Sequence, residues 1–201
     1  MKPPLPFPRT LNALVTLSPV IESRRVLLRY PQMADYEAWA ELREASRSFL
    51  VPWEPTWPLD DLTRIAFRRR LRRYLREIHE DKTCPFFVFD RETGDLVGGC
   101  TLSNIRRGVA QACSLGYWAG ARHARRGYIS EAVQALIPYV FGTMGLHRLE
   151  AACLPANEAS QGLLRKCGFV QEGLARRYLR IDGAWRDHLL FAILDDDPRP
   201  R

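Results

Sequence analysis

Two spacings of apolar residues divide the chain into predicted helices and strands. Over residues 59–80, apolar positions recur every three or four residues and arginines fill the opposite face, which predicts an amphipathic helix. The apolar stripe is Phe67, Leu71, Tyr74, Leu75 and Ile78, and the arginine face is Arg68, Arg69, Arg72, Arg73 and Arg76. Similar patterns predict helices over 35 to about 48, about 129–144 and about 158–167. Pro138 lacks an N–H group, so we expect a modest kink inside the third of these helices.

Short runs of apolar and aromatic residues predict strands between these helices. The predicted strands are 24–30, 86–89, 96–102, 115–118, 148–154, 174–181 and 185–193. Turn signals at 93–95 and at Asp182-Gly183 predict two hairpins. Antiparallel strands followed by alternating helices and strands predict an α/β mixed sheet in a single domain. We expect an extended lead over 1–22, the domain over 23–195 and a short tail over 196–201.

Composition narrows the class of protein. The formal net charge is +7, and only three of the 30 basic residues are lysines, which favours partners with phosphate or carboxylate groups. No stretch of about 18 apolar residues exists, so we expect no membrane span. The proline-rich start is unlike a signal peptide, and we expect a cytoplasmic protein. Five cysteines without a Cys-x-x-Cys pair predict buried, reduced thiols and no metal site: Cys84, Cys100, Cys113, Cys153 and Cys167.

A basic turn at Arg125–Ser130 is the clearest candidate for a binding site. It follows a predicted strand and opens a predicted helix, so backbone N–H groups and the positive end of the helix dipole can meet an anion. Two arginines suit a diphosphate, although an ordinary helix entry with two solvated arginines would have the same sequence. Downstream, Asn157 with Ser160 three residues later is typical of a helix N-cap.

Three segments give the chain a resemblance to a known family. They are Phe49-Leu50-Val51-Pro52-Trp53-Glu54-Pro55, Ser103-Asn104 with Arg107-Gly108 and Leu115-Gly116-Tyr117, and residues 178–188. With the order of elements, they resemble the GNAT N-acetyltransferase superfamily over about 22–195, and within it the RimJ type that acetylates the N-terminal alanine of a small-subunit ribosomal protein. The resemblance implies a GNAT fold, with a mixed, mostly antiparallel sheet flanked by helices and a splayed pair of parallel strands, and acetyl-CoA as co-substrate.

The resemblance also implies roles for individual residues. A bulge at Leu115–Trp118 would splay the parallel strands, so that the pantetheine arm pairs with the exposed strand and one N–H polarises the thioester. Asn157 would contact the pantetheine arm and Ser160 would protonate the departing thiolate. Apart from the resemblance, Glu54 between two prolines is our candidate base acting through a water, although a surface glutamate in a rigid turn, or one that only recognises the amine, would have the same sequence. The implied cofactor-binding residues are Leu115, Tyr117, Trp118, Arg125, Arg126, Gly127, Tyr128, Ile129, Ser130, Asn157 and Ser160.

The sequence departs from the family at the turn and leaves other functions open. Ala124 and Ile129 replace the usual first and last turn residues, and related proteins often carry glycine where Arg125 stands. The expected acceptor is the N-terminus of a ribosomal protein. The arginine face of 59–80, with few acidic neighbours, could dock on ribosomal RNA, a pre-ribosomal particle or an acidic partner, or it could be a solvated face. Alternatives are a GNAT enzyme for small amines or a ribosome-associated assembly factor with weak or no catalysis. His188 beside Asp187 is interpreted as a hairpin contact rather than a catalytic pair.

Overall fold

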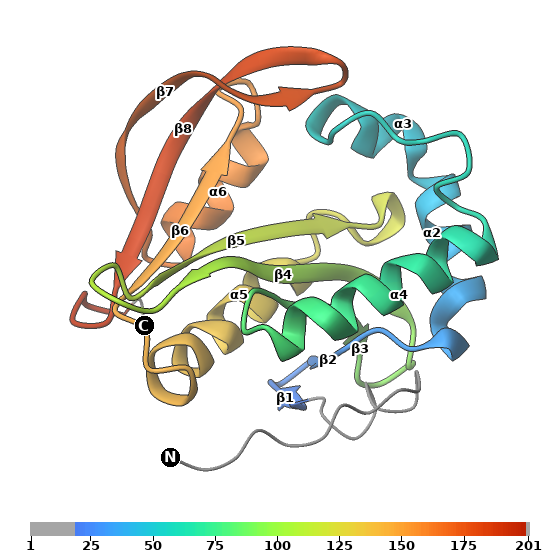
Figure 1. Ribbon diagram of the computed structural model, residues 1–201, viewed down its shortest axis with the longest axis horizontal. Coiled ribbons are helices and arrows are strands. Elements are labelled where there is room, and N and C mark those ends of the chain that lie inside the picture. Colours follow the sequence, from blue (N-terminus) through green and yellow to red (C-terminus); the bar gives the residue numbers. More distant parts are fainter. Residues whose placement is uncertain (1–18, 200–201) are drawn as a thin grey trace.

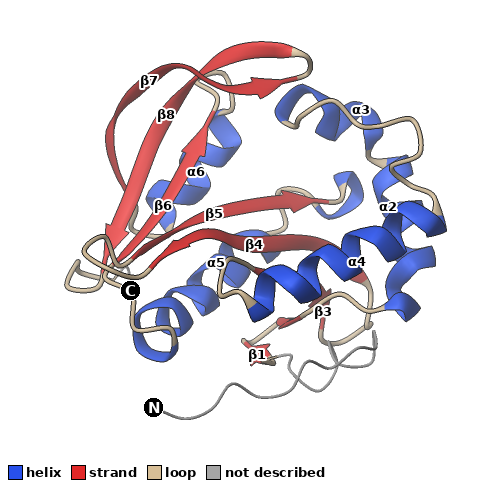
Figure 2. Ribbon diagram, viewed as in Figure 1, coloured by secondary structure: helices blue, strands red, loops and turns tan. Residues whose placement is uncertain are grey.

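The computed structural model describes residues 19–199, so most of the predicted lead lies outside the described residues. One eight-stranded sheet has the order β1-β2-β3-β4-β5-β6-β8-β7 (Figures 1 and 2). Only the β5–β6 pair is parallel in this part of the chain, which confirms the mixed, mostly antiparallel sheet. The strands are β1 Ile21–Glu22, β2 Val26–Arg29, β3 Cys84–Asp90, β4 Leu96–Arg106, β5 Ala112–Ala119, β6 Arg148–Cys153, β7 Val170–Ile181 and β8 Ala184–Leu194.

Helices cover both faces of this sheet. Neighbouring residues of a strand point to opposite faces, and the ring of Phe87 packs near Phe67 of α4 (centroids 6.4 Å apart) while that of Phe86 packs near Tyr139 of η4 (5.9 Å). The helix α4 therefore lies on one face, and α5, which continues into η4, lies on the other. The helices are η1 Met33–Asp35, α2 Tyr36–Ala45, α3 Arg47–Leu50, η2 Val51–Trp53, α4 Arg64–His79, η3 Ala121–His123, α5 Tyr128–Pro138, η4 Tyr139–Thr143 and α6 Glu158–Lys166.

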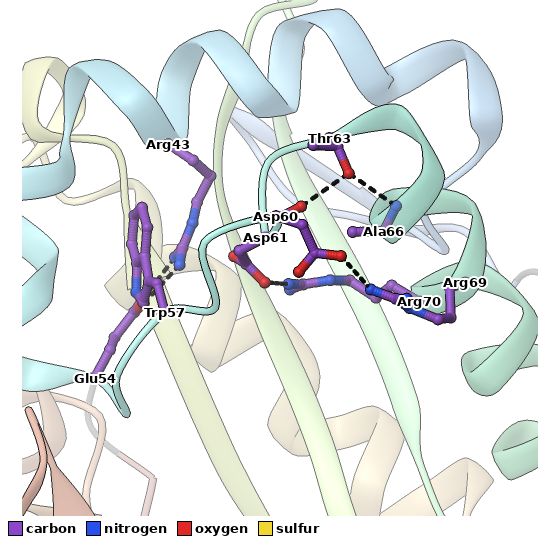
Figure 3. Close-up of polar contacts among 9 residues, drawn as sticks. All are labelled: Arg43, Glu54, Trp57, Asp60, Asp61, Thr63, Ala66, Arg69 and Arg70. Carbon is purple, nitrogen blue, oxygen red and sulfur yellow. Dashed lines mark hydrogen bonds and ion pairs between the residues drawn. The ribbon is translucent and has the colours of Figure 1, made fainter.

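Local capping and proline chemistry explain where the helices differ from the predicted ranges. The long helix begins at Arg64, because the side chain of Thr63 accepts a hydrogen bond from the Ala66 N–H and residues 59–63 form turns (Figure 3). The helix predicted from residue 35 is divided at Ser46, whose hydroxyl accepts a bond from the Ala121 N–H. The α-helical part of 129–144 ends at Pro138, and a π-helical turn follows over Tyr139–Thr143.

The parallel strands β5 and β6 separate halfway along their length. They pair from Ala112↔Arg148 to Leu115↔Ala151 and then diverge (Figure 1). The expected bulge at Leu115–Trp118 is wrong, because β5 keeps an unbroken register with β4 there. The irregularity lies in β4, where the register shifts between Ser103 and Arg106 around Asn104 (φ 50°). The splay itself therefore needs no extra residue in β5.

The arginine face of α4 is more neutralised than the sequence indicated. Arg69 pairs with Asp60 (2.7 Å, Figure 3) and Arg73 approaches Glu77 (3.7 Å), so the expectation of few acidic neighbours is wrong for these two residues. All five cysteines are buried and free, as predicted. Within residues 19–199, no helix is long and apolar enough to cross a membrane.

Candidate active site

A cavity of about 1110 Å³ opens where β5 and β6 separate. Its wall joins the turn before α5, the diverging strands, the start of α6, the loop around Glu54 and the β7–β8 hairpin. All but one of the predicted site residues line it, and Arg126 is the exception. The lining members are Glu54, Leu115, Tyr117, Trp118, Arg125, Gly127, Tyr128, Ile129, Ser130, Asn157 and Ser160.

The turn at 125–130 presents a row of unused backbone donors. None of its six N–H groups has an acceptor within residues 19–199, and the first N–H to resume helical bonding is that of Glu131, which donates to the Gly127 carbonyl (3.0 Å). Arg125 (φ 61°) and Gly127 (φ 81°) both adopt left-handed backbone, which folds the turn into a concave shape. A left-handed backbone at Arg125 is a conformation that favours glycine, so the arginine is held there at a cost in strain. Such a turn can bind an anion such as a diphosphate.

An ion pair that the sequence did not predict holds the backbone of this turn in place. Arg25 donates to Glu131 from its backbone N–H (2.7 Å) and from Nε (2.8 Å), and also to the Arg126 carbonyl (3.1 Å). Burial alone would raise the pKa of the Glu131 carboxyl, but the bonds from Arg25 lower it overall. The two residues are 106 positions apart, so no local pattern could have indicated the pair.

Two hydroxyl groups, one from β5 and one from α6, meet in the wall of the cavity. Tyr117 and Ser160 form a hydrogen bond (2.7 Å), and the Asn157 side chain accepts from the Ser160 N–H (3.0 Å), so the N-cap interpretation of Asn157 is confirmed. Burial raises the pKa of the Tyr117 phenol, partly offset by the Ser160 hydroxyl, and burial also raises the pKa of the Cys153 thiol nearby. This region can deliver a proton but holds no thiolate.

The loop around Glu54, at the end of the cavity away from the turn at 125–130, is fixed by an ion pair. Both Glu54 oxygens accept bonds from the Arg43 guanidinium (2.7 and 2.6 Å), and Trp57 Nε1 donates to one of them (2.7 Å, Figure 3). Arg43 is 7% exposed and also lies over the ring of Trp118. The Asp182 N–H donates to the Glu54 carbonyl (3.0 Å), which ties the loop to the β7–β8 hairpin and closes this end of the cavity. Sequence analysis selected Glu54 but not Arg43, because nothing in a helix pattern marks which arginine points inward.

Two parallel strands separate beside a turn that can bind an anion, and a cavity opens where they diverge. This arrangement is typical of an acyltransferase of the GNAT type. The chain belongs to the acetyltransferase (GNAT) domain family, whose model matches residues 25–170. It is therefore an N-acetyltransferase.

Named relatives support this membership. The Escherichia coli K12 protein named [ribosomal protein uS5]-alanine N-acetyltransferase is 37% identical over 169 residues, covering 83% of this chain and 87% of the relative. The solved ribosomal-protein-S5-alanine acetyltransferase from Vibrio fischeri has a TM-score of 0.81 at 31% identity, covering 90% of this chain and 99% of that one. The structure of Mycobacterium smegmatis RimJ in complex with CoA-disulfide has a TM-score of 0.82 at 32% identity, with coverage of 89% and 87%.

Proposed function

We propose that this protein transfers the acetyl group of acetyl-CoA to the N-terminal α-amine of a ribosomal protein that begins with alanine. The row of free N–H groups at 125–130 carries the proposal, because a diphosphate is the anion that this turn suits. The names of the relatives from E. coli and V. fischeri support the acceptor. A ribosomal-protein acceptor also implies the cytoplasm as the place of action.

The donor would lie along the cavity with its diphosphate at the turn and its thioester at the splay. Residues 125–130 would bind the diphosphate, with Arg125 adding a charge and Arg126 contributing its backbone N–H. Beyond Leu115, the edge of β5 no longer pairs with β6, so it is free to pair with an amide-bearing chain as an added strand would. Among residues 19–199, the side-chain amide nitrogen of Asn157 has no partner, because only the oxygen serves the cap, so it is available to the same chain.

Acetyl transfer would proceed by direct attack of the amine on the thioester. A free α-amine has a pKa of about 8, so a modest fraction is neutral and nucleophilic near pH 7. An N–H of β5 would polarise the thioester carbonyl. The Ser160 hydroxyl, bonded to Tyr117, would protonate the thiolate that leaves. We propose that Glu54 holds the loop in place, because three N–H groups already occupy its two oxygens.

A panel of short peptides that differ only in the first residue tests the acceptor. With acetyl-CoA present, we expect fastest acetylation of the peptide that begins with alanine, detected at the α-amine by tandem mass spectrometry. Equal rates for every first residue, or transfer only to small amines such as polyamines, would contradict the proposed acceptor. Ser160→Ala should lower turnover while CoA binding measured by calorimetry stays intact. Absence of turnover by the wild type on every peptide would favour the assembly-factor alternative.

Docking on ribosomal RNA through α4 is a separate part of the proposal. Arg68, Arg72 and Arg76 have no ion-pair partner within residues 19–199, whereas Arg69 and Arg73 do. Charge reversal at Arg68 and Arg72 should weaken co-sedimentation with ribosomal particles at low salt. Reversal at Arg24, an exposed arginine outside this helix, serves as the control. Unchanged co-sedimentation of the α4 variant would mean that this face is only solvated.

A further inference from the structure

His188 is buried in the cavity wall at the acceptor end. It is 3% exposed, lines the cavity and lies on β8, one residue beyond the last β6–β8 pair, Cys153↔Leu189. Its ring packs edge-on against Tyr178 (centroids 5.8 Å apart). The cavity that would hold the thioester therefore also has this imidazole in its wall.

The neighbouring Asp187 does not form a pair with this histidine. Successive residues of a strand point to opposite faces, and the Asp187 carboxylate instead accepts a bond from the Arg177 N–H (2.8 Å). This bond supports the β7 irregularity between Ala175 and Leu179, where Arg177 has φ 47°. Asp187 therefore shapes the hairpin while His188 faces the cavity.

Hydrogen bonding sets the tautomer of the His188 ring. Nδ1 lies 3.0 Å from the carbonyl oxygen of Arg186, and a carbonyl can only accept, so Nδ1 carries the hydrogen. In the neutral ring, Nε2 is then a free acceptor. Within residues 19–199, the fully buried side-chain atoms without a partner are Arg43 Nε and His123 Nδ1, so the unpaired Nε2 of His188 is open to the cavity.

Three other groups in the cavity wall are poorly suited to accept a proton. Glu54 would have to release Arg43 or Trp57, and burial raises the pKa of the Cys153 thiol, which keeps it protonated. His123 lies beside the diphosphate turn, where burial and Arg122 lower its pKa. The titratable and charged residues that line the cavity with His188 are Glu54, Tyr117, His123, Arg125, Tyr128, Cys153, Glu158, Lys166 and Arg180.

We propose that Nε2 of His188 accepts the proton that leaves the acceptor amine, an inference that rests on the proposed acetyl transfer. The amine nitrogen bonds to the thioester carbon, its proton passes to Nε2, and the carbon–sulfur bond breaks. The thiolate takes a proton from Ser160, His188 returns its proton to solvent, and a proton from solvent restores the Ser160 hydroxyl. The sum is amine plus acetyl thioester giving amide plus thiol, with charge and protons balanced.

A His188→Asn variant tests this role. The asparagine amide can take the place of Nδ1 and donate to the Arg186 carbonyl, but it leaves no acceptor at the position of Nε2. We expect kcat on an alanine-initial peptide to fall about 100-fold, with KM for acetyl-CoA within about twofold of wild type. His147→Asn is the matched control, because His147 is exposed, pairs with Asp195 and is absent from the cavity wall; it should leave kcat unchanged.

The pH profile separates proton acceptance from a merely structural role. Loss of the amine proton gives log kcat/KM a slope of one below about pH 8, and an enzyme group that must accept a second proton-transfer step steepens that slope to two at lower pH in the wild type. The asparagine variant should keep a slope of one. Wild-type kcat in the variant, or a slope of one in the wild type itself, overturns the proposal whether or not the variant folds. If the wild type acetylates no peptide, the proposed function fails instead.

Discussion

Removing the charge of Glu54 should destabilise the fold as well as alter activity. In Glu54→Gln, the Arg43 guanidinium stays 7% exposed and loses both bonds to a carboxylate. Breaking a fully buried pair by removing one partner costs about 3–5 kcal/mol. The Glu54 side chain is 20% exposed and glutamine keeps one oxygen acceptor, so we expect about 2–3 kcal/mol here.

Urea unfolding at pH 7 measures this loss. With a slope of about 2 kcal/mol per molar urea, the midpoint should fall by about 1–1.5 M while the slope stays constant. Glu37→Gln is the matched control, because Glu37 also pairs with an arginine, Arg64, but the two side chains are 69% and 52% exposed. The control should lose no more than about 1 kcal/mol.

Equal, small midpoint shifts for the two variants would refute the reasoning that burial makes the Arg43–Glu54 pair important. A double-mutant cycle with Arg43→Gln sharpens the result, since a coupling energy of about 1–3 kcal/mol is expected for groups in direct contact. The unfolding result also matters for kinetic experiments with Glu54 variants. A drop in turnover reports on the chemical step only when it is corrected for the fraction of protein that is folded.

Three further predictions concern the turn and the hydroxyl pair. Arg125→Gly should raise the urea midpoint by relieving left-handed strain of about 1 kcal/mol while weakening CoA binding several-fold in calorimetry, whereas Arg125→Ala keeps the strain and should only weaken binding. Ser160→Ala should lower kcat about 10–100-fold in steady-state assays, and an unchanged kcat would exclude it as the acid. Because Arg25 lowers the pKa of Glu131, their contact stabilises the fold above the ordinary carboxyl pKa of about 4.3. This stabilisation is lost as the pH falls through the lower pKa of the folded state. The Glu131→Gln variant should therefore differ from wild type in urea midpoint at about pH 7 but not near about pH 2.

Sequence patterns were most informative where a local rule decides the structure. The alternation of elements predicted the mixed sheet, Asp182-Gly183 predicted the hairpin between β7 and β8, and Asn157 predicted the cap of α6. The turn at 125–130 was selected because strand, glycine and helix follow one another in the chain. These are features of neighbouring residues, which a sequence displays directly.

Contacts between distant segments could not be predicted in the same way. Arg25 and Glu131, and Arg43 and Glu54, meet only after the sheet and helices have packed. Likewise, the inward position of His188 depends on the register of β8 against β6, and one residue of slip would turn its side chain outward. Arg69 of α4 was misjudged because Asp60 reaches it from the preceding turn.

The central claim is tested most directly with two peptides of identical sequence, each containing an internal lysine. One peptide has a free α-amine on its first residue, alanine, and in the other that amine is blocked. Incubated with acetyl-CoA and the protein, the free peptide should gain one acetyl group on the α-amine and the blocked peptide none, as read by tandem mass spectrometry. Acetylation of the lysine in both peptides, or of neither peptide despite measurable CoA binding, would contradict the account.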